Sequence, residues 1–170
     1  MDILIRTALE ADLDAAGEVT VEAFVGDGHT SPDAQYVTLL LDARRRAAEA
    51  ELLVAVDPAD LSHGPSGRVL GCVTFAVGGT PWADIATPGE GEIRMLAAAA
   101  DARGRGVGEA LVRACVARSR ELGLTGMAFS TRPAMTAAHR IYERVGFRRA
   151  PERDWRLAPT IELFVYSMTF

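Results

Sequence analysis

The most constraining feature of this sequence is a glycine-rich stretch that runs from Asp101 to Gly108, with glycines at positions 104, 106 and 108. An apolar segment that reads as a strand, residues 92–98, precedes it, and an amphipathic helical segment, residues 108–122, follows it. Alternate glycines let the backbone approach a ligand closely and point successive N–H groups into one concavity. The helix start adds unpaired N–H groups and partial positive charge. The stretch therefore predicts an anion site suited to a pyrophosphate, although alone it fits a simple connector equally well.

Two common phosphate-binding motifs do not fit this stretch. A P-loop needs a Gly-Lys-Ser/Thr sequence, and all 18 cationic residues of this chain are Arg. A dinucleotide motif needs a third glycine, but Glu109 or Leu111 stands at that place, depending on which glycine begins the motif. The absence of Lys also excludes Schiff-base chemistry.

The rest of the chain alternates between strand and helix patterns. Periodicity predicts a helix over 11–24 and a second one that starts at Ser31-Pro32-Asp33 and runs into a solvated Arg44-Arg45-Arg46. Two loops separate the middle strands, and the second, residues 78–89, carries Trp82 and Ile85. Strands are expected over 3–6, 52–56, 68–77, 92–98, 127–130 and 161–170, and the later helices over 108–122 and 133–145. This order predicts one domain, 1–170, with a mixed α/β or α+β sheet covered by helices.

Composition narrows the class of protein. Hydrophobic residues make up 49% and charged residues 24% of the 170 residues, as in ordinary globular proteins. A net charge of −5 argues against a nucleic-acid partner, and no apolar run reaches the roughly 20 residues of a membrane helix. No secretory signal is visible, so we expect a cytoplasmic protein. Cys72 and Cys115 are expected in the core, and the three scattered histidines predict no metal site.

The motifs together resemble a known enzyme family. The stretch Arg103-Gly104-Arg105-Gly106-Val107-Gly108 matches the Arg/Gln-x-x-Gly-x-Gly/Ala signature of the GNAT superfamily of N-acetyltransferases. The opening Ile5–Leu13 and the ending Tyr142–Phe147 look like that family's first strand and helix and its late helix. The resemblance implies a mostly antiparallel, twisted sheet with splayed fourth and fifth strands. It also implies acetyl-coenzyme A (acetyl-CoA) as co-substrate.

The resemblance also implies a set of cofactor-binding residues. The end of the fourth strand would pair with the pantetheine arm, the glycine loop would hold the pyrophosphate, and Ser130 would flank the acetyl group. Many members have Asn where Met135 stands, so one contact differs here. The full set is Leu96, Ala97, Ala98, Arg103, Gly104, Arg105, Gly106, Val107, Gly108, Glu109, Ser130, Met135, Ala138 and Tyr142.

Acetyl transfer to an amine also requires proton transfers. Something must accept the amine proton, and something must protonate the departing thiolate. Tyr142 stands at the family's usual acid position. Glu92 is the first candidate for the base, with Glu90 the second and a water chain a third. A backbone N–H of Ala97 or Ala98 is the candidate donor to the oxyanion.

The acceptor is not readable from the sequence. Trp82, Ile85 and Tyr36 favour an apolar pocket, whereas Asp84, Glu90 and Glu92 favour a cationic amine, so a small metabolite, a drug and a protein N-terminus all stay open. Family members often form dimers, and the strand over 161–170 is the candidate interface. The alternatives to an enzyme are a non-catalytic acyl-CoA-binding or sensor module on the same fold and a nucleotide-binding domain.

Overall fold

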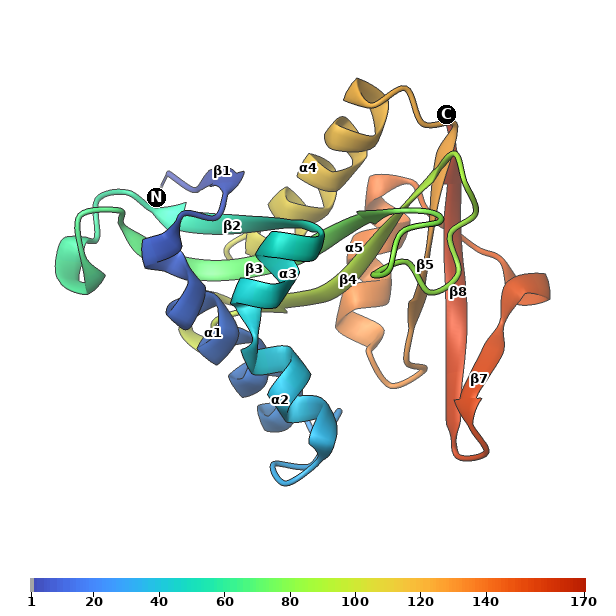
Figure 1. Cartoon of the computed structure of the whole chain (residues 1–170), viewed down its shortest axis with the longest axis horizontal. Helices are drawn as coiled ribbons and strands as arrows, with labels where there is room; N and C mark the ends of the chain where they lie inside the picture. The colour runs from blue at the N-terminus through green and yellow to red at the C-terminus, as the bar shows by residue number, and fades with distance from the viewer. Residues whose placement is uncertain (1) are drawn as a thin grey trace. The chain divides into compact units, whose positions relative to one another are not determined.

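The computed structural model describes residues 2–170, and Figure 1 traces its elements along the chain. The α-helices are α1 (Leu13–Gly26), α2 (Gln35–Leu41), α3 (Ala43–Glu49), α4 (Val107–Glu121) and α5 (Thr136–Val145). The strands are β1 (Leu4–Thr7), β2 (Glu51–Asp57), β3 (Arg68–Val77), β4 (Glu90–Ala98), β5 (Gly126–Thr131), β6 (Arg148–Arg149), β7 (Trp155–Ala158) and β8 (Ile161–Thr169). Short 3-10 helices cover Glu10–Asp12, Leu61–His63, Ala100–Ala102 and Pro151–Arg153.

The strands form a mixed eight-stranded sheet in the order β1-β2-β3-β4-β5-β8-β6, with β7 paired to β8. The chain divides into two compact units. The first comprises Met1–Thr74 with Met95–Leu111, and the second comprises Phe75–Arg94 with Val112–Phe170. Strands β3 and β4 and helix α4 each run through both units. The predicted mixed sheet flanked by helices is confirmed.

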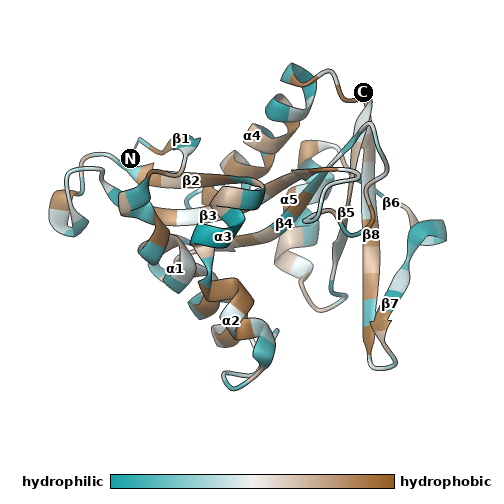
Figure 2. Cartoon of the chain, in the orientation of Figure 1, coloured by the Kyte–Doolittle hydropathy of each residue, from teal (hydrophilic) through white to brown (hydrophobic). Residues whose placement is uncertain are grey.

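The first unit is built around β2. This strand pairs antiparallel with β1, and Leu52 to Val56 are all buried. Its middle is coloured as hydrophobic in Figure 2, between the charged ends Glu51 and Asp57. Helix α1 packs Leu13 and Ala16 into the same core as Val54 and Cys72. The strand 51–57 is therefore buried on both faces, which explains its continuous apolar run.

The expectation that Arg44, Arg45 and Arg46 are all solvated is wrong at one position. Arg44 and Arg45 are exposed, but Arg46 is fully buried. Its guanidinium donates to Thr20 Oγ1 and Thr74 Oγ1 (3.2 Å each) and to the Leu40 carbonyl (2.8 Å). A buried cation needs such partners because desolvation is costly.

The predicted second helix also differs from the structure. It begins at Gln35 rather than after Ser31, and it breaks at Asp42, where ψ is 69°. The Asp42 carboxylate accepts the Arg45 N–H and so caps α3. The helix predicted to start at Pro133 begins three residues later, at Thr136.

The second unit is built around β5 and β8. These strands pair antiparallel from Gly126↔Thr169 to Thr131↔Phe164. Phe129 of β5 lies edge-on to Tyr142 and Phe147, with ring centroids 4.5 and 4.9 Å away. Helix α5 ends at Gly146, whose φ of 117° favours glycine, so the predicted stop is confirmed. Strands β6 and β7 were not predicted.

Strands β4 and β5 pair only briefly. Their parallel ladder contains the pairs Glu90↔Gly126 and Gly91↔Met127, although β4 continues to Ala98 and β5 to Thr131. A short ladder between long strands is the geometry expected of splayed strands. Among residues 2–170, no helix is both long and apolar enough to cross a membrane.

Candidate functional site

The glycine loop lies in the first unit, between the 3-10 helix Ala100–Ala102 and α4. Gly104 and Gly106 have φ of 75° and 82°, a conformation that side chains with a Cβ rarely adopt. A Cβ at either position would meet no atom within 4 Å, so the loop is open on that side. The backbone here can therefore be approached closely by a ligand.

Helix α4 begins directly after this loop, one residue earlier than predicted. The Gly106 carbonyl accepts the first helical hydrogen bond, from the Ala110 N–H (3.0 Å). The N–H groups of Val107, Gly108 and Glu109 therefore belong to the first turn, where no intrahelical acceptor exists. Val107 is buried, whereas residues 103–106 are exposed. Val107 therefore anchors the end of the loop in the core, while residues 103–106 stay at the surface beside the start of α4.

Ion pairs within the first unit hold the flanks of the loop. Arg68 of β3 donates to both carboxylate oxygens of Asp101 (2.6 and 2.7 Å). This pair lowers the pKa of the Asp101 carboxyl. Arg103, one of the predicted cofactor-binding residues, pairs with Asp27 at 2.8 Å.

The end of β4 lies close to β3 in the same unit. A Cβ at Gly71 would stand 2.6 Å from the Ala97 carbonyl oxygen and 2.7 Å from Val107 Cγ1. Glycine at this position thus lets β3 pack against β4 and the start of α4. Ala97 is buried, and Leu96 and Ala98 are half-buried.

Met95 has an unusual backbone conformation. Its φ is 54°, and it is the one residue other than glycine in the described chain with a positive φ. Such a conformation costs about 1–3 kcal/mol and persists where the surrounding structure enforces it. This φ departs from the extended conformation that is usual for a strand.

Glu92 is a buried carboxylate in the second unit, with 1% of its surface exposed. Its Oε2 accepts the N–H groups of Ile85 and Ala86, both at 3.1 Å. Burial raises the pKa of Glu92 to about 7, although the two N–H donors act in the opposite direction. A carboxyl group with this pKa can accept a proton near neutral pH.

Glu90, the second candidate base, has a different environment. Arg153 donates to both of its carboxylate oxygens at 2.9 Å, and the Thr87 N–H and hydroxyl donate to Oε1. These contacts, the Arg153 hydrogen bonds above all, lower the pKa of Glu90 to about 2. A carboxylate that holds protons so weakly is a poor base, so the geometry favours Glu92 over Glu90.

Tyr142 lies on α5 in the second unit. Its ring is buried among Phe129, Phe147 and Tyr166, and burial raises the pKa of its hydroxyl. The hydroxyl therefore stays protonated at neutral pH, and the raised pKa also makes it a weaker proton donor than an ordinary tyrosine. Its role as the acid stays a prediction.

Three further predicted residues lie near the end of β5, just before α5 and on α5. The Ser130 hydroxyl accepts a hydrogen bond from the Trp155 indole N–H (2.8 Å). Met135 precedes α5, and its sulfur accepts from the Thr131 hydroxyl (3.6 Å). Ala138 is half-buried. Sequence reasoning missed Trp155 and Arg153, because both follow the predicted helices in a segment without a clear pattern.

The loop over 78–89 carries apolar residues, but one of them packs inward. Trp82 is buried, and the Arg94 guanidinium lies 5.6 Å from the centroid of its ring. Arg94 also pairs with Asp84 at 3.4 Å and donates to the Trp82 carbonyl. The loop is thus attached to β4 through Arg94 as well as through Glu90 and Glu92.

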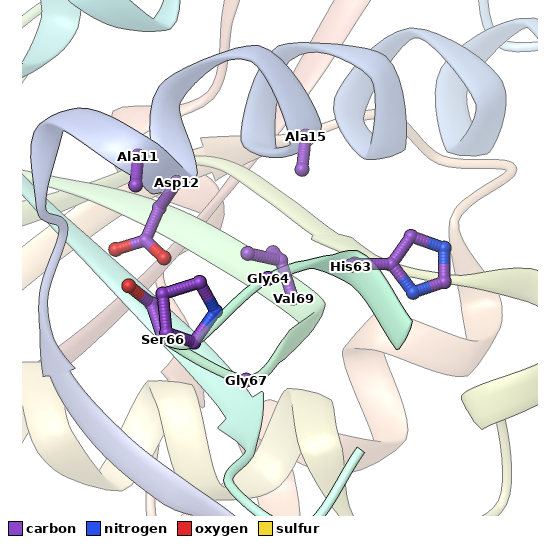
Figure 3. Close-up of a pocket in the computed structure, with 9 residues that line it drawn as sticks. Ala11, Asp12, Ala15, His63, Gly64, Ser66, Gly67 and Val69 are labelled. Atoms are coloured by element: carbon purple, nitrogen blue, oxygen red, sulfur yellow. The ribbon is translucent and has the colours of Figure 1, made fainter. Parts of the chain in front are cut away.

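A small cavity lies elsewhere in the first unit, against the start of α1 (Figure 3). Its volume of about 60 Å³ is far below the roughly 300–1,000 Å³ of pockets that bury drug-sized ligands. Asp12, which points into it in Figure 3, is already paired with Arg6 at 2.6 Å. None of its lining residues is a predicted site residue, so it is not the cofactor site. Within residues 2–170, no group of three or more His, Cys, Asp or Glu side chains is arranged to hold a metal.

Comparison with known proteins decides the family. The model of the acetyltransferase (GNAT) family matches residues 18–147, most of the chain. The chain belongs to this family. The predicted resemblance to this family is thereby confirmed. GNAT acetyltransferases act on amine acceptors such as peptides or small molecules.

Individual relatives agree with this assignment. A mycothiol acetyltransferase of Geodermatophilus obscurus is 37% identical over 87 residues, which span 47% of this chain and 28% of that protein. A GNAT acetyltransferase of Staphylococcus aureus Mu50 shares the fold with a TM-score of 0.74, 13% identity and 99% coverage of both chains. The PaiA N-acetyltransferase of Thermoplasma acidophilum, solved with coenzyme A, aligns over the full length of both chains with a TM-score of 0.71 and 14% identity.

Proposed function

We propose that this GNAT chain, acting as one domain over 1–170, transfers the acetyl group of acetyl-CoA to an amine directly within a ternary complex. The observation that carries the proposal is Glu92. It is a buried carboxylate with a pKa of about 7, on the strand that leads into the glycine loop. Buried ionisable groups with a pKa near the working pH are typical of general bases.

The glycine loop fits the cofactor assigned to it. The positive φ angles of Gly104 and Gly106 and the open space beside them suit a ligand that contacts backbone. The amides of Arg105 through Glu109 would hold the pyrophosphate at the start of α4, and Leu96 to Ala98 would pair with the pantetheine arm. Acetyl-CoA supplies the acetyl group as a thioester.

Glu92 and Tyr142 would carry the two proton transfers. An alkyl amine has a pKa near 10.4, so the nucleophile must lose a proton before or during attack. Because Glu92 is buried, it would accept that proton through a water rather than by direct contact with the amine. Tyr142, kept protonated by burial, would donate to the departing sulfur.

Direct transfer is favoured by the cysteines. A covalent acetyl-enzyme would need an accessible nucleophile, and the chain's two cysteines, Cys72 and Cys115, are both fully buried. The Ser130 hydroxyl is engaged by Trp155. Transfer within a ternary complex needs no such group.

The acceptor is proposed to be an amine, without a narrower chemical class. Of the three carboxylates that suggested a cationic acceptor, Asp84 pairs with Arg94 and Glu90 pairs with Arg153. Their charge is thus largely compensated. The mycothiol acetyltransferase matches over only 28% of its length, so it supports the reaction class rather than its acceptor. The same proposal includes a cytoplasmic location and a homodimer formed through residues 161–170. It also includes catalysis without a metal ion and without a nucleic-acid partner.

Replacing Tyr142 with Phe tests the acid. The ring and its packing against Phe129 remain, so the fold and acetyl-CoA affinity should change little. Turnover should fall about 100-fold, because a positioned general acid contributes about 10²- to 10⁴-fold. Steady-state kinetics with a good acceptor, beside a titration of acetyl-CoA, would measure both. Phe147→Leu, which alters the same aromatic cluster without removing a hydroxyl, is the control. Unchanged turnover in the Phe variant would remove Tyr142 from the acid role.

A further inference from the structure

Hydrogen bonds to charged side chains hold three consecutive residues of the loop before β4, namely Ile85, Ala86 and Thr87. Glu92 accepts the N–H groups of Ile85 and Ala86. Glu90 accepts the N–H of Thr87 at 2.9 Å and its hydroxyl at 2.7 Å. The Thr87 carbonyl in turn accepts the Glu90 N–H. The two carboxylates, two residues apart on β4, thus bind one short segment.

Arg153 closes this arrangement from a different part of the chain. Its guanidinium makes two parallel hydrogen bonds to Glu90 and donates a third to the Ile85 carbonyl at 3.2 Å. The Ile85–Ala86 peptide unit is therefore bound at both ends, by Glu92 through the Ala86 N–H and by Arg153 through the Ile85 carbonyl. A planar guanidinium suits this bidentate contact, whereas an ammonium group acts as a point charge.

Close packing leaves the segment little room to move. A Cβ at Gly78 would lie 1.9 Å from the Thr87 carbonyl oxygen, so the backbone of Gly78 runs directly against it. The Gly78 N–H donates to the Glu90 carbonyl at 2.8 Å. The orientation of the Ile85 and Ala86 amides is thus set by contacts on both flanks.

We propose that Arg153 is a positioning residue for acetyl transfer: through Glu90 and the Ile85 carbonyl it fixes the amide pair that holds Glu92 in place. The inference rests on the proposed role of Glu92 as the base. Arg153 acts through Glu90 and the Ile85 carbonyl, not through contact with substrate or cofactor.

The charges that face Glu92 give the sign of the expected effect. Asp84 in the loop raises the pKa of Glu92, whereas Arg94 on β4 lowers it. Arg153 and Glu92 also attract each other. Loss of Arg153 would weaken the hold on the two N–H donors and remove a positive charge. Both changes disfavour the ionised carboxylate, so Glu92 should ionise at higher pH.

The test compares Arg153→Gln with Arg149→Gln. Arg149 is a matched control, because it also makes a bidentate pair, with Asp154, and donates to a carbonyl, that of Val165. The midpoint of the pH profile of kcat/KM should move upward by about one pH unit in Arg153→Gln. It should stay at the wild-type midpoint in Arg149→Gln. Equal midpoints in the two variants would overturn the proposal.

Arg153→Lys separates positioning from charge. Lys keeps the positive charge but not the three-bond fork, so its midpoint should shift by at least half as much as that of Arg153→Gln. A wild-type midpoint in the Lys variant would show that charge alone matters and would overturn the positioning role.

A ¹³C NMR titration of the Glu92 carboxyl, assigned by its loss in Glu92→Gln, measures the same shift without substrate. It distinguishes two failures. If Glu92→Gln keeps full turnover, the proposed base is wrong, yet the titration still decides whether Arg153 governs Glu92. If Glu92→Gln loses turnover and the carboxyl titrates identically in the wild type and Arg153→Gln, the positioning role alone is wrong.

Discussion

Replacing Glu92 with Gln should lower turnover by about 10²- to 10⁴-fold, the contribution of a positioned general base, while the fold persists. Gln has almost the same shape, and its carbonyl oxygen can accept the Ile85 and Ala86 N–H groups as the carboxylate does. Loss of the base therefore need not disturb the loop. Steady-state kinetics with a saturating amine would measure the change.

The pH profile of the wild type should show the same group. Because the base must be unprotonated, kcat/KM should rise with pH through about 7, the pKa of Glu92, and then level off. In Glu92→Gln the residual activity should lack this rise. Glu121→Gln, an exposed carboxylate at the end of α4, should keep both the rise and the turnover.

The free energy of unfolding of Glu92→Gln tests the structural effect of the substitution apart from its effect on catalysis. The pKa of Glu92 is about 7 in the folded protein, against an ordinary value of 4.5. Between these values the folded form keeps a proton that the unfolded form loses, so the free energy of unfolding of the wild type falls as pH rises through this window. The loss reaches about 3–4 kcal/mol once the pH is above 7. Glu92→Gln avoids it and should gain melting temperature relative to the wild type between pH 5 and 8.

A wild-type level of turnover in Glu92→Gln would contradict the base assignment. A variant that is inactive but also unfolded at every pH would contradict the claim that this carboxylate is retained at a cost to stability. Circular dichroism melts across the pH range, run on the preparations used for kinetics, decide between these outcomes.

Replacing Gly106 with Val should weaken acetyl-CoA binding by about 10- to 100-fold. At φ of 82° a β-branched residue is strained by about 1–2 kcal/mol, so the backbone would rotate and turn amides of the loop away. The new side chain would also occupy space in which no protein atom lies within 4 Å. Each tenfold loss corresponds to about 1.4 kcal/mol. Isothermal titration of acetyl-CoA measures the affinity.

Gly123→Val is the matched control for this substitution. Gly123 follows the other end of α4, has φ of 70°, and likewise has no atom near its would-be Cβ. Both variants should therefore lose similar stability, and only Gly106→Val should lose affinity for acetyl-CoA. Equal affinities in the two variants would show that the glycine loop does not bind the cofactor.

Much of the fold could be predicted where the signals are local. The pattern of α4 and its preceding glycines depends on neighbours in sequence, and its predicted start was one residue from the observed one. Gly146 ended α5 as predicted, because a left-handed residue closes a helix within one turn. Cys72 and Cys115 are buried as their apolar surroundings indicated. The short ladder between β4 and β5 was expected only from the family resemblance.

Other features could not be predicted because they depend on distant contacts. Arg46 looks like the solvated end of a basic run in the sequence, but the hydroxyls of Thr20 and Thr74, far away in sequence, accept hydrogen bonds from its guanidinium in the core. Ser31-Pro32 looks like a helix start, yet the Ser31 hydroxyl bonds to the Asp33 carboxylate instead. Met95 carries no sign of a positive φ, since Gly, Asn or Asp would be usual there.

In the candidate site, too, local features could be predicted and features that depend on distant contacts could not. The glycine loop could be located from composition and spacing alone. The difference between Glu90 and Glu92 could not, because it depends on Arg153, which is 63 residues from Glu90 along the chain. The two carboxylates look equivalent in sequence, but one is paired with Arg153 and the other is buried against backbone amides.

The most direct test of acetyl transfer to an amine is thiol release from acetyl-CoA across a panel of chemically diverse amines, with mass spectrometry of the products. The structure predicts release that depends on the amine, reaches a maximum above pH 7, and yields an acceptor heavier by one acetyl group. Tight binding of acetyl-CoA with no amine-dependent thiol release across the panel would contradict the claim. It would indicate instead a cofactor-binding module on the GNAT fold.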